Sequence, residues 1–389
     1  MTGMPERIGR YAVARELGSG GMGEVYLAYT PGGAPVAVKL IRSDKLDELT
    51  RARFEKEALI ARTVIGTNRV ARFLEADPFA DRPWLAMEYV AGRTLLACVE
   101  QDGALPLQLV ASLGALLAEG LEAVHAAGLL HRDLKPQNVM MGKDGPMIID
   151  FGLGAFMDAA QESLSNSGMI IGTVRCMPPE QASGHPKVTS AADVYALGTV
   201  LLYAAARHYP YDGVVWEAVA MQVANPDIGP DLSGVPEALR PLIASMLAHE
   251  PEDRPKLDAV AQTCTDLLKE AGVAPANARL ALIARTTEGG SPDAAEGPLS
   301  PEFEKLLEDQ VRLEEAGDVD SPLDGRRRSD AAGADEEPGE GGGDDARQAE
   351  ELAPASAGLA APPHTGGRQP ASKRVADELR RQYAVDAAL

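Results

Sequence analysis

The sequence predicts an α+β protein with a small β-rich part at residues 11–90, a larger helical part at residues 91–271, and a tail at residues 272–389. Three observations support this division. Short runs in which apolar and polar residues alternate, as is typical of strands, fill most of the first part. Segments rich in Ala and Leu with helical spacing fill the second part. The tail is dominated by Pro, Gly, Ala, Asp and Glu, a composition that predicts disorder because it buries too little apolar surface to fold.

The individual elements follow from the same patterns. In the first part, one helical stretch near residues 51–64 interrupts the strands. In the second part, helices are expected at residues 107–127, 190–203, 216–223, 237–248 and 257–271. In the tail, apolar spacing allows short helices near residues 301–316 and 373–389. Each of these could bind an unknown protein partner, although a transient helix in a solvated linker is the more frequent case.

The composition limits the classes of function. The 389 residues carry a formal net charge of −21, whereas binding to nucleic acid or an anionic membrane calls for a basic field, so neither partner is expected. The N-terminus lacks a secretory signal pattern, and the longest apolar stretch, residues 107–128, contains charged residues and predicts a buried helix rather than a membrane span. Cys98, Cys176 and Cys264 lack metal-binding spacing and are expected to be free thiols in a reducing cytoplasm.

A glycine-rich segment opens the β-rich part. It consists of Leu17, Gly18, Ser19, Gly20, Gly21, Met22, Gly23, Glu24 and Val25. Residues 24–29 alternate with period two and predict a strand, so the glycines lie in a hairpin rather than at the start of a helix, as they would in a dinucleotide-binding fold. Because glycine has no Cβ, such a hairpin can lay backbone N–H groups over phosphates.

A single lysine, Lys39, ends the next apolar strand. A lone lysine in this position is usually just solvated. The following helix offers two carboxylate partners for it, Glu55 and Glu57. Glu57 shares a helix face with apolar residues such as Phe54 and Ile60, and this face is expected to turn inward. We therefore predict an ion pair between Lys39 and Glu57.

An acid, a cation and a carboxamide follow one another in the helical part. Asp133, Lys135 and Asn138 lie in the segment His-Arg-Asp-Leu-Lys-Pro-Gln-Asn at residues 131–138. This spacing suits phosphoryl transfer to a hydroxyl, in which a carboxylate accepts the proton and a carboxamide ligates a metal ion. Twelve residues after Asn138, a short apolar strand ends in Asp150, whose carboxylate is a hard oxygen ligand suited to magnesium.

These motifs, in this order, resemble those of bacterial, actinobacterial-like Hanks-type serine/threonine protein kinases, over about two-thirds of the chain. The resemblance implies a two-lobed protein-kinase fold, with the N-lobe at residues 11–90 and the C-lobe at residues 91–271. It also implies transfer of the ATP γ-phosphate to Ser and Thr hydroxyls of protein substrates, including autophosphorylation, in bacterial signalling. ATP with Mg²⁺ or Mn²⁺ is then the expected cofactor set.

The resemblance also assigns catalytic roles. Asp133 orients and deprotonates the substrate hydroxyl, and Lys135 offsets charge on the moving phosphoryl group. Lys39, paired with Glu57, orients the phosphates of ATP. Thr173 resembles the residue that bridges the catalytic Asp and Lys in serine/threonine kinases.

Metal and nucleotide contacts follow in the same way. Asn138 and Asp150 would hold the metal ion. Met87 matches the gatekeeper position, and the backbone of Glu88 and Val90 would contact adenine. The residues expected to contact ATP are Leu17, Gly18, Ser19, Gly20, Gly21, Met22, Gly23, Glu24, Val25, Ala37, Lys39, Met87, Glu88 and Val90.

Three further residues match structural landmarks of the family. Glu180 ends a Pro-Pro-Glu element in which Pro178 replaces the usual Ala, and Arg254 is expected to be its buried ion-pair partner. Asp193 matches the residue that braces the catalytic loop.

Two other functions are compatible with parts of this pattern. A pseudokinase would be a nucleotide-binding scaffold that recruits partners through its tail, but its usual sign is loss of the metal-binding Asp, the catalytic Asp or the Lys, and all three are present. A small-molecule phosphotransferase on the same fold is the second alternative. The complete activation segment at residues 150–180, which resembles a platform for protein substrates, argues against it.

Overall fold

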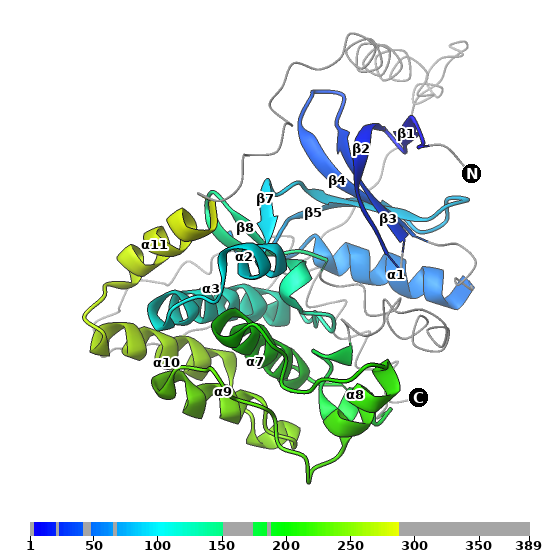
Figure 1. Ribbon diagram of the computed structural model, residues 1–389. Coiled ribbons are helices and arrows are strands. Elements are labelled where there is room, and N and C mark those ends of the chain that lie inside the picture. The colour runs from blue at the N-terminus through cyan, green and yellow to red at the C-terminus, as the bar shows by residue number, and fades with distance from the viewer. Residues whose placement is uncertain are drawn as a thin grey trace, which may run out of the picture.

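The computed structural model describes residues 4–20, 23–41, 48–64, 68–150, 174–184 and 188–287. These residues form a sheet-based N-terminal lobe and a helical C-terminal lobe (Figure 1). The two lobes are joined by a connector, residues 89–91, between strands β6 and β7. The predicted two-lobed α+β class is therefore confirmed.

The N-terminal lobe contains a six-stranded antiparallel sheet. Its strands are β1 (Arg7–Ile8), β2 (Tyr11–Gly20), β3 (Gly23–Tyr29), β4 (Pro35–Ile41), β5 (Phe73–Asp77) and β6 (Trp84–Glu88). Along the sheet they follow the order β1-β2-β3-β4-β6-β5. Lys39 therefore lies on an interior strand, paired with Val25 of β3 on one side and Leu85 of β6 on the other.

Helix α1 (Glu48–Ala61) packs against this sheet. Its buried residues Phe54 and Ala58 join a cluster with residues of β4 and β6, including Leu85 and Met87. The helix begins and ends three residues earlier than the predicted range of 51–64.

The C-terminal lobe is mainly helical, and the predicted helices are confirmed with small shifts in their ends. Its α-helices are α2 (Leu95–Asp102), α3 (Leu107–Ala126), α6 (Pro179–Ala182), α7 (Ala191–Ala206), α8 (Trp216–Ala224), α9 (Arg240–Met246), α10 (Leu257–Glu270) and α11 (Pro275–Thr287). Short 3-10 turns lie at η2 (Pro136–Asn138), η3 (Glu237–Leu239) and η4 (Pro251–Asp253).

Helices α3 and α7 form the centre of this lobe, and glycines let their neighbours approach closely. A Cβ on Gly114 of α3 would lie 2.8 Å from Cys264 Sγ of α10, and one on Gly198 of α7 would lie 2.8 Å from the Cβ of Met246. Both distances are too short for a real side chain, so these helix pairs depend on the missing Cβ.

A small three-stranded sheet lies where the two lobes meet. Strands β7 (Gly92–Thr94), β8 (Val139–Gly142) and β9 (Gly145–Ile148) follow the order β7-β8-β9. Strand β8 begins directly after the catalytic segment, and β9 ends two residues before Asp150. The sheet therefore holds both ends of the candidate site.

The expected end of the folded domain at residue 271 is wrong. Residues 275–287, which we predicted as part of the tail, form helix α11 and pack against α3, α10 and the small sheet (Figure 1). Ala278, Leu282 and Thr286 recur at every fourth residue and are all buried. The Ala-rich composition hid this short face, because each buried side chain except Leu282 is small or polar.

Two expectations from the composition concern α3 and the cysteines. Among the described residues, α3 is the one helix long and apolar enough to cross a membrane, and 61% of its apolar window is buried inside the protein, as in a core helix. All three cysteines are free and buried. Burial raises the pKa of the Cys98 and Cys176 thiols, and that of Cys264 to about 12, so these thiols stay protonated at neutral pH.

Candidate active site

The catalytic segment brings a lysine onto the carboxylate of Asp133. Lys135 Nζ lies 2.9 Å from Oδ1 and 2.7 Å from Oδ2 of Asp133, and both side chains are largely shielded from solvent. Pro136 starts the η2 turn, which suits a residue without an N–H at the first position of a helix. This turn directs Lys135 back towards Asp133.

Asn138 closes the same turn. Its Nδ2 donates to the Asp133 carbonyl at 2.8 Å and lies 3.2 Å from Asp133 Oδ2. The backbone carbonyl of Asn138 accepts a hydrogen bond from the N–H of Ile149 at 2.9 Å. The residue before Asp150 is thus attached to Asn138, and the two predicted metal ligands are held on adjacent segments.

Lys39 and Asp150 join the lobes across 111 residues of sequence. Lys39 Nζ lies 2.8 Å from Asp150 Oδ2, and Lys39 is buried. Burial disfavours the charged form of Asp150, but the Lys39 ammonium, with smaller contributions from Lys135 and His131, outweighs burial and lowers the pKa of this carboxyl. Asp150 therefore stays an anion at neutral pH.

Glu57 lies on the inward face of α1, as the helical spacing predicted. Its side chain is buried, whereas that of Glu55 is exposed. Spacing along a helix identifies which side chains turn inward, but it does not give the distance between that helix and a strand. The ion pair between Glu57 and Lys39 therefore stays a prediction, whereas the contact of Lys39 with Asp150 is one that the sequence reasoning did not predict.

The glycine-rich segment forms the end of the β2–β3 hairpin. Gly18 pairs with Val25, and Gly20 pairs with Gly23. Gly23 has a φ of +151°, and a Cβ there would lie 1.8 Å from the carbonyl oxygen of Leu40. Only glycine fits this position.

Several residues predicted to contact ATP gather in one apolar cluster. Ala37 and Met87 are buried members, and Leu17 and Val25 pack against them while remaining partly exposed. The hairpin and the strand before the connector thus supply one apolar surface, which suits the face of a flat aromatic ring.

The remaining predicted contacts are placed as follows. Ser19 lies exposed in the hairpin. The Glu24 carboxylate accepts hydrogen bonds from Arg82 at 2.8 Å and from the Tyr26 hydroxyl at 3.0 Å. The Glu88 N–H donates to the Arg72 carbonyl at 2.8 Å, while Val90 packs near Gly142 of β8. Gly21, Met22 and Thr173 lie outside the described residues.

Asp193 braces the catalytic segment, as predicted. Its Oδ1 accepts the N–H of Arg132 at 2.9 Å, and its Oδ2 accepts the N–H of His131 at 2.9 Å and lies 2.7 Å from His125 Nε2. Burial opposes the charged form of Asp193, but these hydrogen bonds and the two histidines outweigh it and lower the pKa of the carboxyl.

His131 connects the catalytic segment to the strand that leads to Asp150. Its Nδ1 accepts the N–H of Asp133 at 3.3 Å, and its Nε2 lies 3.0 Å from the Ile149 carbonyl. His131 therefore links Asp133 to the residue that precedes Asp150.

Glu180 and Arg254 form the predicted ion pair. Arg254 Nη1 and Nη2 lie 2.8 Å from Oε1 and Oε2 of Glu180, and both side chains are buried. The guanidinium also donates to the carbonyls of residues 191, 248 and 249, so its charge is fully hydrogen-bonded.

His125 is a site residue that the sequence analysis did not identify, because it lies within an otherwise largely apolar helix. It lies in the last turn of α3 and reaches Asp193 of α7. The signal was available: a lone histidine in the last turn of a buried helix, six residues before the catalytic segment, needs a polar partner.

Comparison with known proteins assigns the family. Residues 11–265 match the protein kinase domain model. The serine/threonine-protein kinase AfsK of Streptomyces coelicolor is 44% identical over 253 residues, which are 64% of this chain and 31% of that protein. The probable serine/threonine-protein kinase PkwA of Thermomonospora curvata is 41% identical over 266 residues, 68% of this chain and 35% of that one. The chain thus spans about one-third of these relatives.

Solved structures agree. The crystal structure of a point-mutant form of the PknI kinase domain of Mycobacterium tuberculosis matches with a TM-score of 0.54 and 25% identity, covering 68% of this chain and 99% of that one. A second PknI kinase-domain structure gives a TM-score of 0.53 at 26% identity, covering 68% of this chain and 96% of that one. With the matched domain covering more than half of its length, the chain belongs to the protein kinase family, and its curated relatives carry the names of bacterial serine/threonine kinases.

Proposed function

We propose that this chain is a serine/threonine protein kinase that transfers the γ-phosphate of ATP to Ser and Thr hydroxyls of protein substrates and of itself. The observation that carries the proposal is one unbroken series of contacts from Lys135 through Asp133 and Asn138 to the segment of Asp150 and on to Lys39. These five residues come from both lobes, and phosphoryl transfer needs charged groups arranged around the phosphate in this way.

Asp133 is proposed to orient the substrate hydroxyl and accept its proton, because its carboxylate is held in a fixed position. Lys135 lies directly on this carboxylate and would offset the charge of the moving phosphoryl group. Thr173 remains the proposed bridge between the two. The next residue, Val174, is buried in a cluster with Tyr211 of the C-lobe.

ATP is proposed to lie between the hairpin and the connector. The apolar surface of Leu17, Val25, Ala37 and Met87 would receive the adenine. With its N–H bonded to Arg72, Glu88 would contact adenine through its carbonyl, and Val90 through its backbone. The hairpin glycines would lie over the phosphates, which Lys39 would orient with Glu57 as its proposed partner.

Asn138 and Asp150 fit a divalent cation, Mg²⁺ or Mn²⁺. Both offer hard oxygen ligands, and the hydrogen bond from Ile149 to Asn138 keeps their segments together. When bound, such an ion neutralises charge on the phosphates of ATP.

The retention of Lys39, Asp133 and Asp150 argues against a pseudokinase. We further place this kinase in the bacterial cytoplasm, where ATP is available and buried free thiols such as Cys98, Cys176 and Cys264 persist. Residues 301–316 and 373–389 remain proposed contacts for a protein partner.

Transfer of labelled phosphate from radiolabelled ATP tests the proposal. The full chain should label itself and casein on serine or threonine, whereas Asp133→Asn and Lys39→Ala should each reduce the rate by at least about 100-fold at equal folded content. Lys269→Ala, on the exposed side of α10, is the matched control and should keep the wild-type rate. Wild-type rates in either site variant, or labelling of tyrosine alone, would contradict the proposal.

A further inference from the structure

Helix α11 lies outside the family match, which ends at residue 265. It nevertheless packs against α3, α10 and all three strands of the small sheet. The buried face formed by Ala278, Leu282 and Thr286 makes this packing specific rather than incidental.

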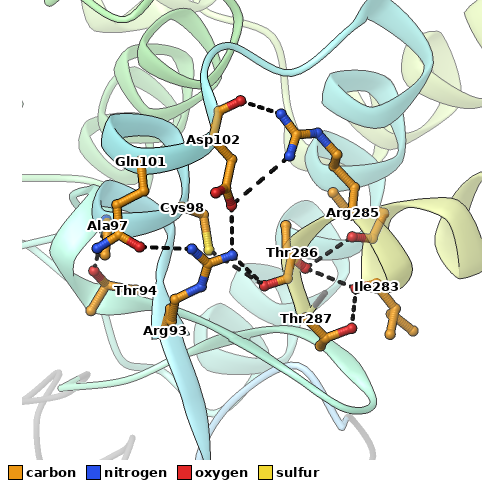
Figure 2. Close-up of polar contacts among 11 residues, drawn as sticks. Arg93, Thr94, Ala97, Cys98, Gln101, Asp102, Ile283, Arg285, Thr286 and Thr287 are labelled. Atoms are coloured by element: carbon orange, nitrogen blue, oxygen red, sulfur yellow. Dashed lines mark hydrogen bonds and ion pairs between the residues drawn. The ribbon is translucent and has the colours of Figure 1, made fainter. Parts of the chain in front are cut away.

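The end of α11 and the segment that begins the C-lobe are joined by two arginine side chains, one from each segment (Figure 2). Arg285 Nη2 donates to the carbonyl of Asp102, the last residue of α2, and Arg93 Nη2 donates to the carbonyl of Thr286 at 2.8 Å. The last carbonyls of a helix lack donors within the helix and form the negative end of its dipole. Each helix end therefore receives a cation from the other segment.

The Asp102 carboxylate lies between the two guanidinium groups. Arg93 Nη2 lies 2.6 Å from Asp102 Oδ2, and Arg285 Nη1 lies 3.9 Å from the same oxygen. The hydrogen bond from Arg93 lowers the pKa of Asp102, so this carboxyl stays charged at neutral pH. The second terminal nitrogen of Arg93, Nη1, donates a hydrogen bond to Gln101 Oε1 at 2.9 Å. The guanidinium of Arg93 is therefore held from two sides.

A second attachment lies earlier on α11. Arg279 Nη2 donates at 2.9 Å to the carbonyl of Asp144, in the turn between β8 and β9, and Arg69 Nη1 donates to the same oxygen at 2.8 Å. Ile283 lies near Gly145, the first residue of β9, with Cγ1 3.8 Å from the position that a Cβ on this glycine would take. The β8–β9 hairpin is thus attached to α11 by hydrogen bonds to the Asp144 carbonyl and packs closely against it.

These two attachments meet at the connector between the lobes. A Cβ on Gly142 of β8 would lie 3.2 Å from Val90 Cγ1 and 3.3 Å from the Ala91 carbonyl, so the connector rests on the hairpin that α11 holds. Gly92 lies closer still, because its Cβ would lie 2.3 Å from the Met141 carbonyl. Arg93 follows directly in the chain.

We propose that α11 belongs to the catalytic unit, and that Arg285 and Arg93 are positioning residues that fix the connector where it would contact adenine. The inference rests on the proposed function, because the ligand of the connector is the ATP of that proposal. Loss of these contacts frees the connector and weakens the binding of nucleotide more than the binding of a peptide substrate.

Fluorescent-ATP binding and steady-state kinetics on full-length Arg285→Ala test this. The Kd of the analogue and the KM for ATP should rise about 5- to 20-fold, the size of a typical coupling between sites, while the KM for a peptide substrate stays within about twofold. Arg285→Lys should recover part of the loss, because its ammonium can still donate to the Asp102 carbonyl. Leu280→Ala, on the exposed side of α11, is the matched control and should bind like wild type.

Asp102→Asn gives an independent measurement if Arg285→Ala does not fold, because it keeps the carbonyl that Arg285 contacts and removes only the carboxylate. Asp102→Asn should also raise the KM for ATP, but by a smaller factor than Arg285→Ala does. Wild-type nucleotide binding in Arg285→Ala, or in Asp102→Asn where that variant must serve, overturns the inference and leaves the proposed kinase activity standing. A wild-type chain that binds no ATP overturns the proposed function and this inference with it.

Discussion

Asp193 accepts the N–H of Arg132, whose φ of +62° lies in the left-handed region that residues other than glycine rarely adopt. Such a conformation costs about 1–3 kcal/mol and persists only where its surroundings hold it. The buried carboxylate does so by binding two successive N–H groups, those of His131 and Arg132. The catalytic Asp133 is the next residue, so its direction depends on a side chain 60 positions away.

Asp193→Asn should disorganise this segment. An amide keeps the shape but presents an NH₂ group to at least one backbone N–H, so a buried donor loses its acceptor. We expect the free energy of unfolding to fall by about 1–3 kcal/mol and kcat to fall at least about tenfold. Urea denaturation and kinase assays measure the two effects. Asp266→Asn, a surface ion-pair variant on α10, should change the stability by less than about 1 kcal/mol, and equal stabilities of the two variants would contradict the bracing role.

Acid should weaken the same brace. The hydrogen bonds to Asp193 hold its pKa below the ordinary value of 3.8 despite its burial. The native state therefore binds this proton less readily than the unfolded chain does. The contribution of Asp193 to stability is complete above the ordinary pKa and is lost as the pH falls through the depressed native pKa.

Urea denaturation from about pH 6 to about pH 2 checks this sign. The stability of the wild type should fall more steeply in acid than that of Asp193→Asn, which has no carboxyl to protonate. Parallel curves for the two proteins would show that Asp193 has the same pKa in both states.

Arg254→Ala should destabilise the C-lobe strongly. Removing the guanidinium leaves Glu180 as an unpaired buried carboxylate, which typically costs about 3–5 kcal/mol. A double-mutant cycle with Glu180→Ala isolates the pair, because the second mutation should cost little once the first is present. Additive effects of the two mutations, measured by urea denaturation, would mean that they act independently.

Gly23→Ala should damage the hairpin, whereas Gly18→Ala should be tolerated. A methyl group at residue 23 would meet the Leu40 carbonyl, whereas one at residue 18 has no neighbouring atom within 4 Å. We expect a loss of about 2 kcal/mol or more at Gly23 and less than about 1 kcal/mol at Gly18, measured by thermal and urea unfolding. Similar losses in the two variants would argue against the close approach to β4.

The order of motifs along the chain was sufficient to predict the two lobes. The Glu180–Arg254 pair and the Asp193 brace were predicted from the resemblance to the family, and the contacts confirm both. The catalytic and nucleotide-binding roles of residues such as Asp133 and Lys39 stay predictions, because contacts between side chains do not measure turnover.

What the sequence did not reveal has physical reasons. The helical periodicity correctly predicted that Glu57 faces inward. Whether its carboxylate contacts Lys39 depends on the distance between α1 and the sheet, and no local sequence pattern encodes that distance. Helix α11 was missed because its buried face is short, and because its Arg93–Thr286 and Arg279–Asp144 hydrogen bonds join residues that lie far apart in the sequence.

The contact between Arg93 and Thr286 also limits how early the connector can be fixed while the chain is being synthesised. Its two residues are 193 positions apart, and they lie near the two ends of the C-lobe sequence. At synthesis rates of about 5–20 residues per second, Thr286 is added roughly 10–40 s after Arg93. The strand that follows the connector is therefore made early but acquires this partner last. A nascent chain still lacking α11 would carry every predicted catalytic residue and yet lack the contact that fixes the connector.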